Sequence, residues 1–254
     1  MTIPVAAPPL PQDLDDLLHR LRLPHLRRLA PEVLATATRR GAAGFPTGKT
    51  FSGWDESACS IPRPTQAALR TLEWIGRKEN LVVCGPSGTG RSYFLEALGQ
   101  AAVEAGRRVA WFSLESLGAM VHRSRADDSV VKVVGRILRA DLVVVDDIGL
   151  LPVSIEAAEG LYRLVDAAYE RRSVAISSNL HPAGFDELMP KTLATATVDR
   201  LRHHAHLCVT SRESVRLAHA TSGAGVKALV QEEPSLTPGR RRQGALNTLS
   251  GQTA

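Results

Sequence analysis

The chain has 254 residues, of which 44% are apolar and only 4% are aromatic. This length and composition suit one well-buried α/β domain with smaller appendages. No apolar run approaches the ~20 residues that cross a bilayer, and the first residues lack the pattern of a secretory signal, so we expect a cytoplasmic protein with no membrane partner. The net charge of +5 favours a polyanionic partner, and nucleic acid is the natural candidate.

Residues 1–44 predict a small helical region with a disordered, Pro-rich start. Leucines at helical spacing predict a short amphipathic helix from Asp13, and a second helix is predicted to follow Pro31. Acidic and basic side chains are mixed here, which fits either a docking module or a solvated helical face. Frequent Gly and Pro in residues 41–64 predict a linker onto the main domain, and residues 65–77 predict a helix.

Residues 85–92 read GPSGTGRS and follow the apolar run 81–84, which predicts a buried strand. The glycines would let the backbone point successive N–H groups at phosphate oxygens, and a helix beginning near Arg91 would add its positive N-terminal dipole. The Ser92 hydroxyl is predicted to bind Mg²⁺. The predicted phosphate-binding residues are Gly85, Pro86, Ser87, Gly88, Thr89, Gly90, Arg91 and Ser92.

Arg91 stands where a loop of this kind has lysine. A planar guanidinium is wider than an ammonium, so it would either bind the phosphates slightly out of register or clash with the γ-phosphate. We therefore expect ATP binding to survive and any ATPase activity to be weakened. Only five of the 31 basic residues are lysine, so a general replacement of lysine by arginine is an alternative explanation.

The β-branched run 142–145 predicts a strand that is buried on both faces, and it ends in Asp146 and Asp147. Two carboxylates at the tip of such a strand are costly unless a cation or a proton transfer uses them. Asp146 is predicted to hold Mg²⁺ through water, and Asp147 to orient or deprotonate the attacking water. The simpler interpretation is a pair of solvated acids in a turn.

Strands and helices alternate along the chain, which predicts a three-layer α/β fold with a central parallel sheet. The strand at 174–178 is followed by Asn179, an amide placed to hydrogen-bond the γ-phosphate or its attacking water, with a plain turn-forming role as the alternative. A helix at 193–204 carries Arg200, a candidate arginine finger.

Histidine and cysteine side chains do not predict a metal site. His203, His204 and His206 lack Cys or acidic partners at useful spacing. The three cysteines, at 59, 84 and 208, are far apart, so we expect buried thiols and neither disulfides nor metal ligands.

Five ordered motifs resemble the IstB/DnaC-like branch of the AAA+ ATPases, and IstB-type helpers of insertion-sequence transposases most of all. The resemblance covers about residues 45–217 and departs from the family pattern at Arg91 and in a shortened region between Arg40 and Gly41. The motifs are the loop at 85–92, LVVVDDIG at 142–149, SSN at 177–179, VDRLRHHAH at 198–206 and SVR at 214–216.

The resemblance implies a P-loop NTPase of the AAA+ type at 45–217 with ATP and Mg²⁺ as cofactors. It implies Asp146 and Asp147 as the metal-side and catalytic acids and Asn179 as the first sensor. It further implies that Arg200 is supplied in trans to a neighbour's ATP, and that Arg216 is the second sensor. An arginine in trans makes a homo-oligomer a chemical requirement. Residues 218–254 are expected to form a flexible basic tail.

The function predicted is an ATP-binding helper that oligomerises on DNA and assists a transposase. A DnaC-like loader of a replicative helicase shares every motif, a nucleotide-binding scaffold with impaired hydrolysis fits Arg91, and a small-molecule kinase fits the loop alone. DNA contact is expected to be largely independent of sequence, because no base-reading motif is visible. The candidate phosphate contacts are Arg123, Arg125, Lys132, Arg136, Arg139 and Arg240 to Arg242.

Overall fold

A five-stranded sheet in which every pairing is parallel forms the centre of the molecule. The structure, a computed structural model, describes residues 7–125, 129–150 and 153–211. Within these ranges the strand order is β2-β3-β4-β1-β5. The strands are β1 (Asn80–Cys84), β2 (Val109–Ser113), β3 (Leu142–Ile148), β4 (Ser173–Ser178) and β5 (Ala205–Val209).

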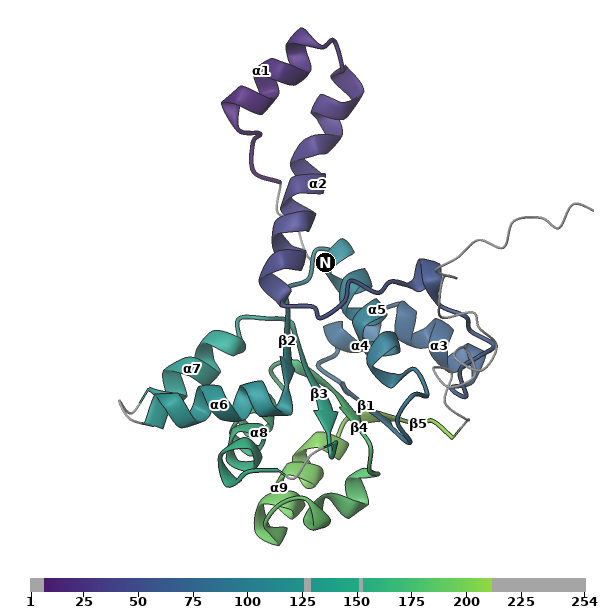
Figure 1. The fold of residues 1–254 in the computed structure, drawn as a ribbon, viewed down its shortest axis with the longest axis vertical. Helices are drawn as coiled ribbons and strands as arrows, with labels where there is room; N and C mark the ends of the chain where they lie inside the picture. The colour runs from purple at the N-terminus through teal and green to yellow at the C-terminus, as the bar shows by residue number, and fades with distance from the viewer. Residues whose placement is uncertain (1–6, 126–128, 151–152, 212–254) are drawn as a thin grey trace, which may run out of the picture.

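Helices cover both faces of the sheet, which makes three layers (Figure 1). The helix α5 (Arg91–Glu104) packs on one face together with α3 (Arg63–Arg70) and α4 (Glu73–Gly76). The opposite face carries α6 (Leu114–Arg125), α7 (Val130–Ile137), α8 (Ile155–Ala168) and α9 (Lys191–Arg202). Short 3₁₀ turns lie at η1 (Phe51–Gly53) and η2 (Pro182–Glu187). The predicted α/β class with a central parallel sheet is confirmed.

The central strands are buried on both faces because successive side chains pack alternately into the two hydrophobic cores. Leu142 and Val144 of β3 belong to the core beside α5, whereas Val143 and Val145 belong to the core beside α6 and α8. Successive side chains of a strand point to opposite faces, so a continuous apolar run is what a sheet between two helical layers requires. The three cysteines are buried, as predicted, and burial raises the pKa of the Cys208 thiol to about 11.

The two N-terminal helices, α1 (Gln12–Arg20) and α2 (Pro24–Ala43), form a hairpin that projects from the sheet domain (Figure 1). The prediction that the second helix follows Pro31 is wrong, because α2 begins at Pro24 and holds Pro31 in its interior. Proline is favoured in the first turn, where its missing N–H costs nothing, and both prolines could have played that part. None of the described helices is long and apolar enough to cross a bilayer.

The helix predicted over residues 65–77 is broken into α3 and α4. Leu72, between them, has a φ of 59°, which interrupts the helical backbone. At the break, the Ala68 carbonyl accepts hydrogen bonds from Thr71 N (3.2 Å) and Thr71 Oγ1 (2.8 Å). The Leu69 carbonyl accepts from Leu72 N (3.1 Å) and from the Trp74 indole (3.0 Å). The buried Trp74 side chain is thereby satisfied, and it anchors the short α4 in the core next to β1.

Candidate functional site

The loop between β1 and α5 lies at the carboxyl edge of the sheet and has the backbone of a phosphate-binding loop. Its glycines Gly85, Gly88 and Gly90 have φ values of 146°, 85° and 86°, which L side chains rarely adopt. A Cβ atom at Gly85 would also lie 2.1 Å from the carbonyl oxygen of Thr210. The loop is therefore wedged against the residue that follows β5, and only glycine fits at its start.

Thr210 closes the loop onto the edge strand and was missed by the sequence prediction. Its hydroxyl lies 2.7 Å from the Thr89 hydroxyl and donates to the carbonyl oxygen of Cys84 at 3.2 Å. Thr210 directly follows Val209, which is in register with Cys84. Thr210 lies one residue past β5, and this position has meaning only once β5 is known to pair with β1.

Ser92, which follows the loop, is in contact with Asp146 of β3, as their predicted shared role in Mg²⁺ binding requires. The Ser92 hydroxyl donates a hydrogen bond of 2.9 Å to Asp146 Oδ1, and the Ser177 hydroxyl donates to the same oxygen. Asp146 is only 5% exposed. A buried carboxylate held by two hydroxyl groups is a set of hard oxygen donors of the kind that Mg²⁺ prefers. The residues present therefore fit a magnesium ion at this position.

Arg91 contacts the predicted sensor residue Asn179. Asn179 Oδ1 accepts a hydrogen bond from Arg91 Nη2 and another, of 3.3 Å, from the Ser87 hydroxyl. The backbone N–H of Asn179 donates to Ile148 at 2.8 Å, and its side-chain amide nitrogen donates to Gly149 at 3.4 Å. These bonds aim the amide oxygen at the loop. Arg91 is 6% exposed, so its guanidinium lies inside the site and not in solvent.

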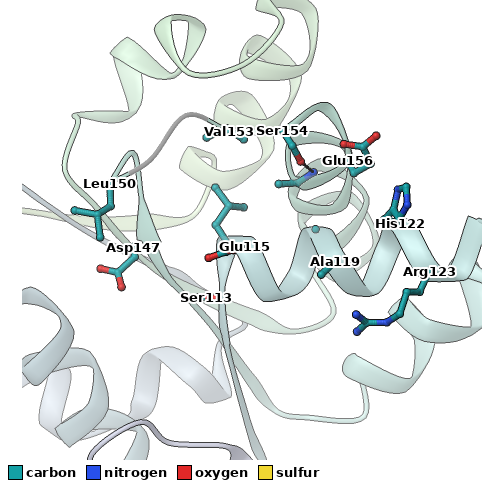
Figure 2. Close-up of a pocket in the computed structure, with 13 residues that line it drawn as sticks. Ser113, Glu115, Ala119, His122, Arg123, Asp147, Leu150, Val153, Ser154 and Glu156 are labelled. Atoms are coloured by element: carbon teal, nitrogen blue, oxygen red, sulfur yellow. Dashed lines mark hydrogen bonds between the residues drawn. The ribbon is translucent and has the colours of Figure 1, made fainter.

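Asp147 lies on the other face of β3 from Asp146. It is exposed, has a φ of 61° and lies within the register shift between Val145 and Ile148. Its carboxylate lines a cavity of about 530 Å³ between α6 and the start of α8. Figure 2 shows Asp147 and Leu150 at one end of this cavity and His122 and Arg123, both on α6, at the other. The Asp146 carboxylate thus accepts hydrogen bonds from Ser92 and Ser177, whereas Asp147 contacts the Ser177 hydroxyl through its backbone N–H, at 3.1 Å.

Arg200 lies at the opposite end of the sheet from its own phosphate loop. Its Nε donates to Asp166 of α8 at 2.6 Å, and its guanidinium lies 5.4 Å from the centre of the Tyr162 ring. The next residue, Leu201, accepts a hydrogen bond from Asn80 at the start of β1. The length of β1, roughly 15 Å, therefore separates Arg200 from the loop that follows that strand.

The remaining predicted residues that the structure describes are not part of this edge. Arg216 and the tail arginines lie outside the described residues. Arg125 of α6 forms an ion pair with Glu159 of α8. The other basic residues predicted to contact DNA on this side of the sheet are on α6, on α7 or just after α7, and they are Arg123, Lys132, Arg136 and Arg139.

The fold and the edge just described define an α/β P-loop NTPase fold. The chain belongs to the family described as "IstB-like ATP binding protein", whose model matches residues 14–223. It is similar to the insertion sequence IS21 ATP-binding protein of Pseudomonas aeruginosa, with 32% identity over 182 residues, which is 71% of this chain and 69% of that protein.

Two solved structures show the same fold at low sequence identity. The replication initiator DnaA bound to AMPPCP and single-stranded DNA matches with a TM-score of 0.55 and 16% identity over 72% of this chain and 56% of that chain. The DnaC helicase loader matches with a TM-score of 0.50 and 15% identity over 65% of this chain and 98% of that chain. The chain therefore spans little more than half of that DnaA chain.

Proposed function

We propose that this protein binds ATP with Mg²⁺ at the carboxyl edge of its sheet, oligomerises on DNA and assists a transposase. The observation that carries the proposal is the meeting of three separate motifs at one edge. Ser92 of the loop contacts Asp146 of β3, and Arg91 of the loop contacts Asn179 after β4. A phosphate loop, an acidic strand end and a polar sensor at one edge are the parts that a nucleoside-triphosphate site needs.

In this proposal the loop amides between Gly85 and Ser92 hold the phosphates, and Ser92 with Asp146 holds Mg²⁺. The ion would neutralise phosphate charge. Asn179 orients the attacking water or the γ-phosphate, since its amide oxygen already faces the loop. Asp147 accepts a proton from that water. This last role requires its side chain to turn toward the loop from the cavity that it now lines.

Arg200 is proposed to act in trans, on the nucleotide of a neighbouring subunit. Its distance from its own loop supports this assignment, because a positive charge there cannot stabilise its own reaction. The Asp166 carboxylate holds the guanidinium on the surface of α8 and α9 until a neighbour arrives. Arg216 is proposed as the second sensor on the motif resemblance alone.

Assistance to a transposase is proposed because the similar proteins are named for insertion sequences. DNA contact is supported by the net positive charge and by the basic side chains of α6 and α7. Because phosphate neutralisation releases counterions, affinity for duplex DNA should fall steeply with salt. A DnaC-like loader remains the alternative partner class. Recovery of a replicative helicase instead of a transposase with the tagged protein would favour that alternative.

The decisive experiment measures ATP hydrolysis with and without duplex DNA for the wild type, Asp147→Asn and Arg200→Ala. We expect DNA to stimulate the wild type and neither variant. Mixing the two inactive variants in equal amounts should restore about a quarter of the activity, since about a quarter of the interfaces then join an intact acid to an intact arginine. Unchanged activity in both single variants would reject the assigned roles, and failure of the mixture to recover would reject action in trans.

A nucleotide-gated scaffold that hydrolyses ATP poorly is favoured by one specific observation. The Arg91 guanidinium donates a hydrogen bond to Asn179 Oδ1, the oxygen that Asn179 would need to orient the attacking water. If wild-type protein binds ATP and assembles on DNA but turns over no faster than Asp147→Asn, the scaffold is the correct function.

A further inference from the structure

Three metal-ligand side chains gather where α8 and α9 end, at the opposite end of the sheet from the phosphate loop. They are Glu170, just after α8, and His203 and His204, just after α9. One ligand atom from each lies within 4.8 Å of the others, and all three residues are exposed. The cluster escaped the sequence prediction, which found the histidines without an acidic partner.

The fold places these side chains through two helix ends that pack on each other. The helix α8 stops at Ala168, and Glu170 takes a φ of 58° in the turn that follows. The backbone carbonyl of His204 accepts a hydrogen bond of 2.7 Å from Asn80 N, which ties the end of α9 to the start of β1. The cluster is therefore anchored by the sheet although its side chains face solvent.

The histidine rings are already oriented by neighbours. The Tyr169 hydroxyl lies 2.9 Å from His203 Nδ1, a contact that fixes the plane of that ring. The two imidazole rings meet edge to face with centroids 4.1 Å apart. His204 Nε2 lies 3.9 Å from Glu170 Oε1, too far for a hydrogen bond. A hydrogen-bond partner on one nitrogen of a ligand histidine is the common second layer of a metal site.

The spacing suits a bridging ion. Ligand atoms about 2.0–2.2 Å from a tetrahedral ion lie roughly 3.4 Å from one another, so separations of up to 4.8 Å have to shorten by at most about 1.4 Å. Small rotations of exposed side chains supply that movement. Two imidazoles and one carboxylate favour Zn²⁺ and its neighbours Co²⁺ and Ni²⁺ over Mg²⁺, which prefers oxygen ligands alone.

We propose that Glu170, His203 and His204 form a surface site for a transition-metal ion of the Zn²⁺ class. The ion would join the end of α8 to the end of α9, the same two helices that Asp166 and Arg200 connect. Metal binding would then stiffen the helix that carries Arg200. The site itself does not depend on nucleotide binding or on any role of Arg200.

The test uses the full chain without a histidine tag, treated with a chelator and kept free of nucleotide. Co²⁺ is titrated and its visible absorption recorded, followed by competition with Zn²⁺. We expect saturation at about one ion per chain, with an intensity typical of four or five ligands. Glu170→Gln, His203→Gln and His204→Gln should each weaken binding at least about 10-fold.

Two further variants separate a metal site from a merely structural contact. His206→Gln is the matched control, because His206 is an exposed histidine on the adjoining strand that pairs with Glu79 outside the cluster. It should leave Co²⁺ affinity unchanged. Tyr169→Phe keeps all three ligands but removes the orienting hydroxyl, so affinity should fall about 10-fold while the melting temperature without metal changes little.

Absence of saturable Co²⁺ binding by the wild type overturns the proposal. So does binding that survives the simultaneous loss of all three ligands, or that His206→Gln weakens as much as His204→Gln. Should a histidine variant fail to fold, Glu170→Gln decides alone, because it changes only an exposed carboxylate.

Discussion

The phosphate-loop edge and the α1–α2 hairpin are built in contrasting ways from the same chain. At the edge, Asp146, Ser177 and Thr210 are buried polar residues that the sheet holds in hydrogen bonds. In the hairpin, α1 has no buried residue, and its described ion-pair connection to α2 is an exposed Asp15–Arg27 contact at 2.5 Å. Buried polar networks are costly to disrupt, whereas exposed pairs contribute little.

The contrast shows which interactions determine the conformation of each region. The conformation of the edge is fixed by long-range strand register, so a change of a few atoms there should have a large effect on stability. The hairpin is fixed by local helix formation, and it leaves several large apolar side chains exposed, among them Leu17, Leu21, Leu26, Val33 and Leu34. Substitutions at the edge should therefore act through the whole domain, and substitutions in the hairpin should act locally.

The largest effect is expected for Gly85→Ala. The new Cβ would meet the Thr210 carbonyl and force a backbone conformation that is essentially restricted to glycine. Together these should cost about 4 kcal/mol in unfolding free energy. Gly106→Ala is the matched control, since Gly106 also has a positive φ, of 80°, but nothing lies near its Cβ. That change should cost about 1 kcal/mol. If denaturant titrations gave the same loss of unfolding free energy for both variants, the clash with Thr210 would not contribute to it.

The second-largest effect is expected for Asp146→Asn. The amide keeps a hydrogen-bond acceptor for Ser92 and Ser177 but loses the charge that would hold Mg²⁺. We expect the gain in ATP affinity on adding Mg²⁺ to fall at least about 10-fold, or 1.4 kcal/mol, by calorimetry. The neighbouring Asp147→Asn should bind as well as the wild type. Equal loss in both variants would contradict the separation of the two carboxylates by the faces of β3.

Arg91→Lys should have a smaller and opposite effect on turnover. Lysine would release the Asn179 oxygen and present a compact charge to the phosphates, so ATP hydrolysis should rise about 10-fold. Arg70→Lys, an exposed arginine on α3 that pairs with Glu56, controls for the general exchange of arginine for lysine. A lower rate for Arg91→Lys would mean that the site is adapted to arginine.

The sequence predicted the sheet and much of the edge because those features have short-range signals. Apolar runs predicted the strands, and the glycines predicted the loop. Serine is a residue type favoured at a helix N-cap, and Ser154 caps α8, where its hydroxyl accepts from Ala157 N at 3.2 Å. Alternation along β3 could also have placed Asp146 and Asp147 on opposite faces, since the core residues before them alternate in the same way.

Other features depend on contacts that no local pattern contains. Glu170 meets His203 and His204 only because α8 ends early and packs on α9. Thr210 meets Thr89 only because β5 pairs with β1. The break at Leu72 has no glycine or proline to signal it, and Trp74 stabilises it from the core. Tertiary packing overrides local propensity at these positions.

The smallest expected effect is a local one, on the hairpin. The Arg27 guanidinium beside Asp15 lowers the pKa of that carboxyl from its ordinary value of 3.8. The pair therefore stabilises α1 fully at any pH above 3.8, and this stabilisation is lost as the pH falls through the lowered pKa. Asp15→Asn should therefore weaken the NMR signals of an ordered α1 at neutral pH, most clearly at low salt, and leave the sheet amides unchanged.

The same helix offers the control for this change. Asp13→Asn removes an equal charge from the first turn of α1 without removing the contact with Arg27. If both variants loosen α1 alike, net charge and the helix dipole hold it, and the pair does not. If instead the Asp15 variant disturbs amides of β1 or α5, the hairpin is coupled to the nucleotide edge, and the distinction between a locally determined and a globally determined region fails.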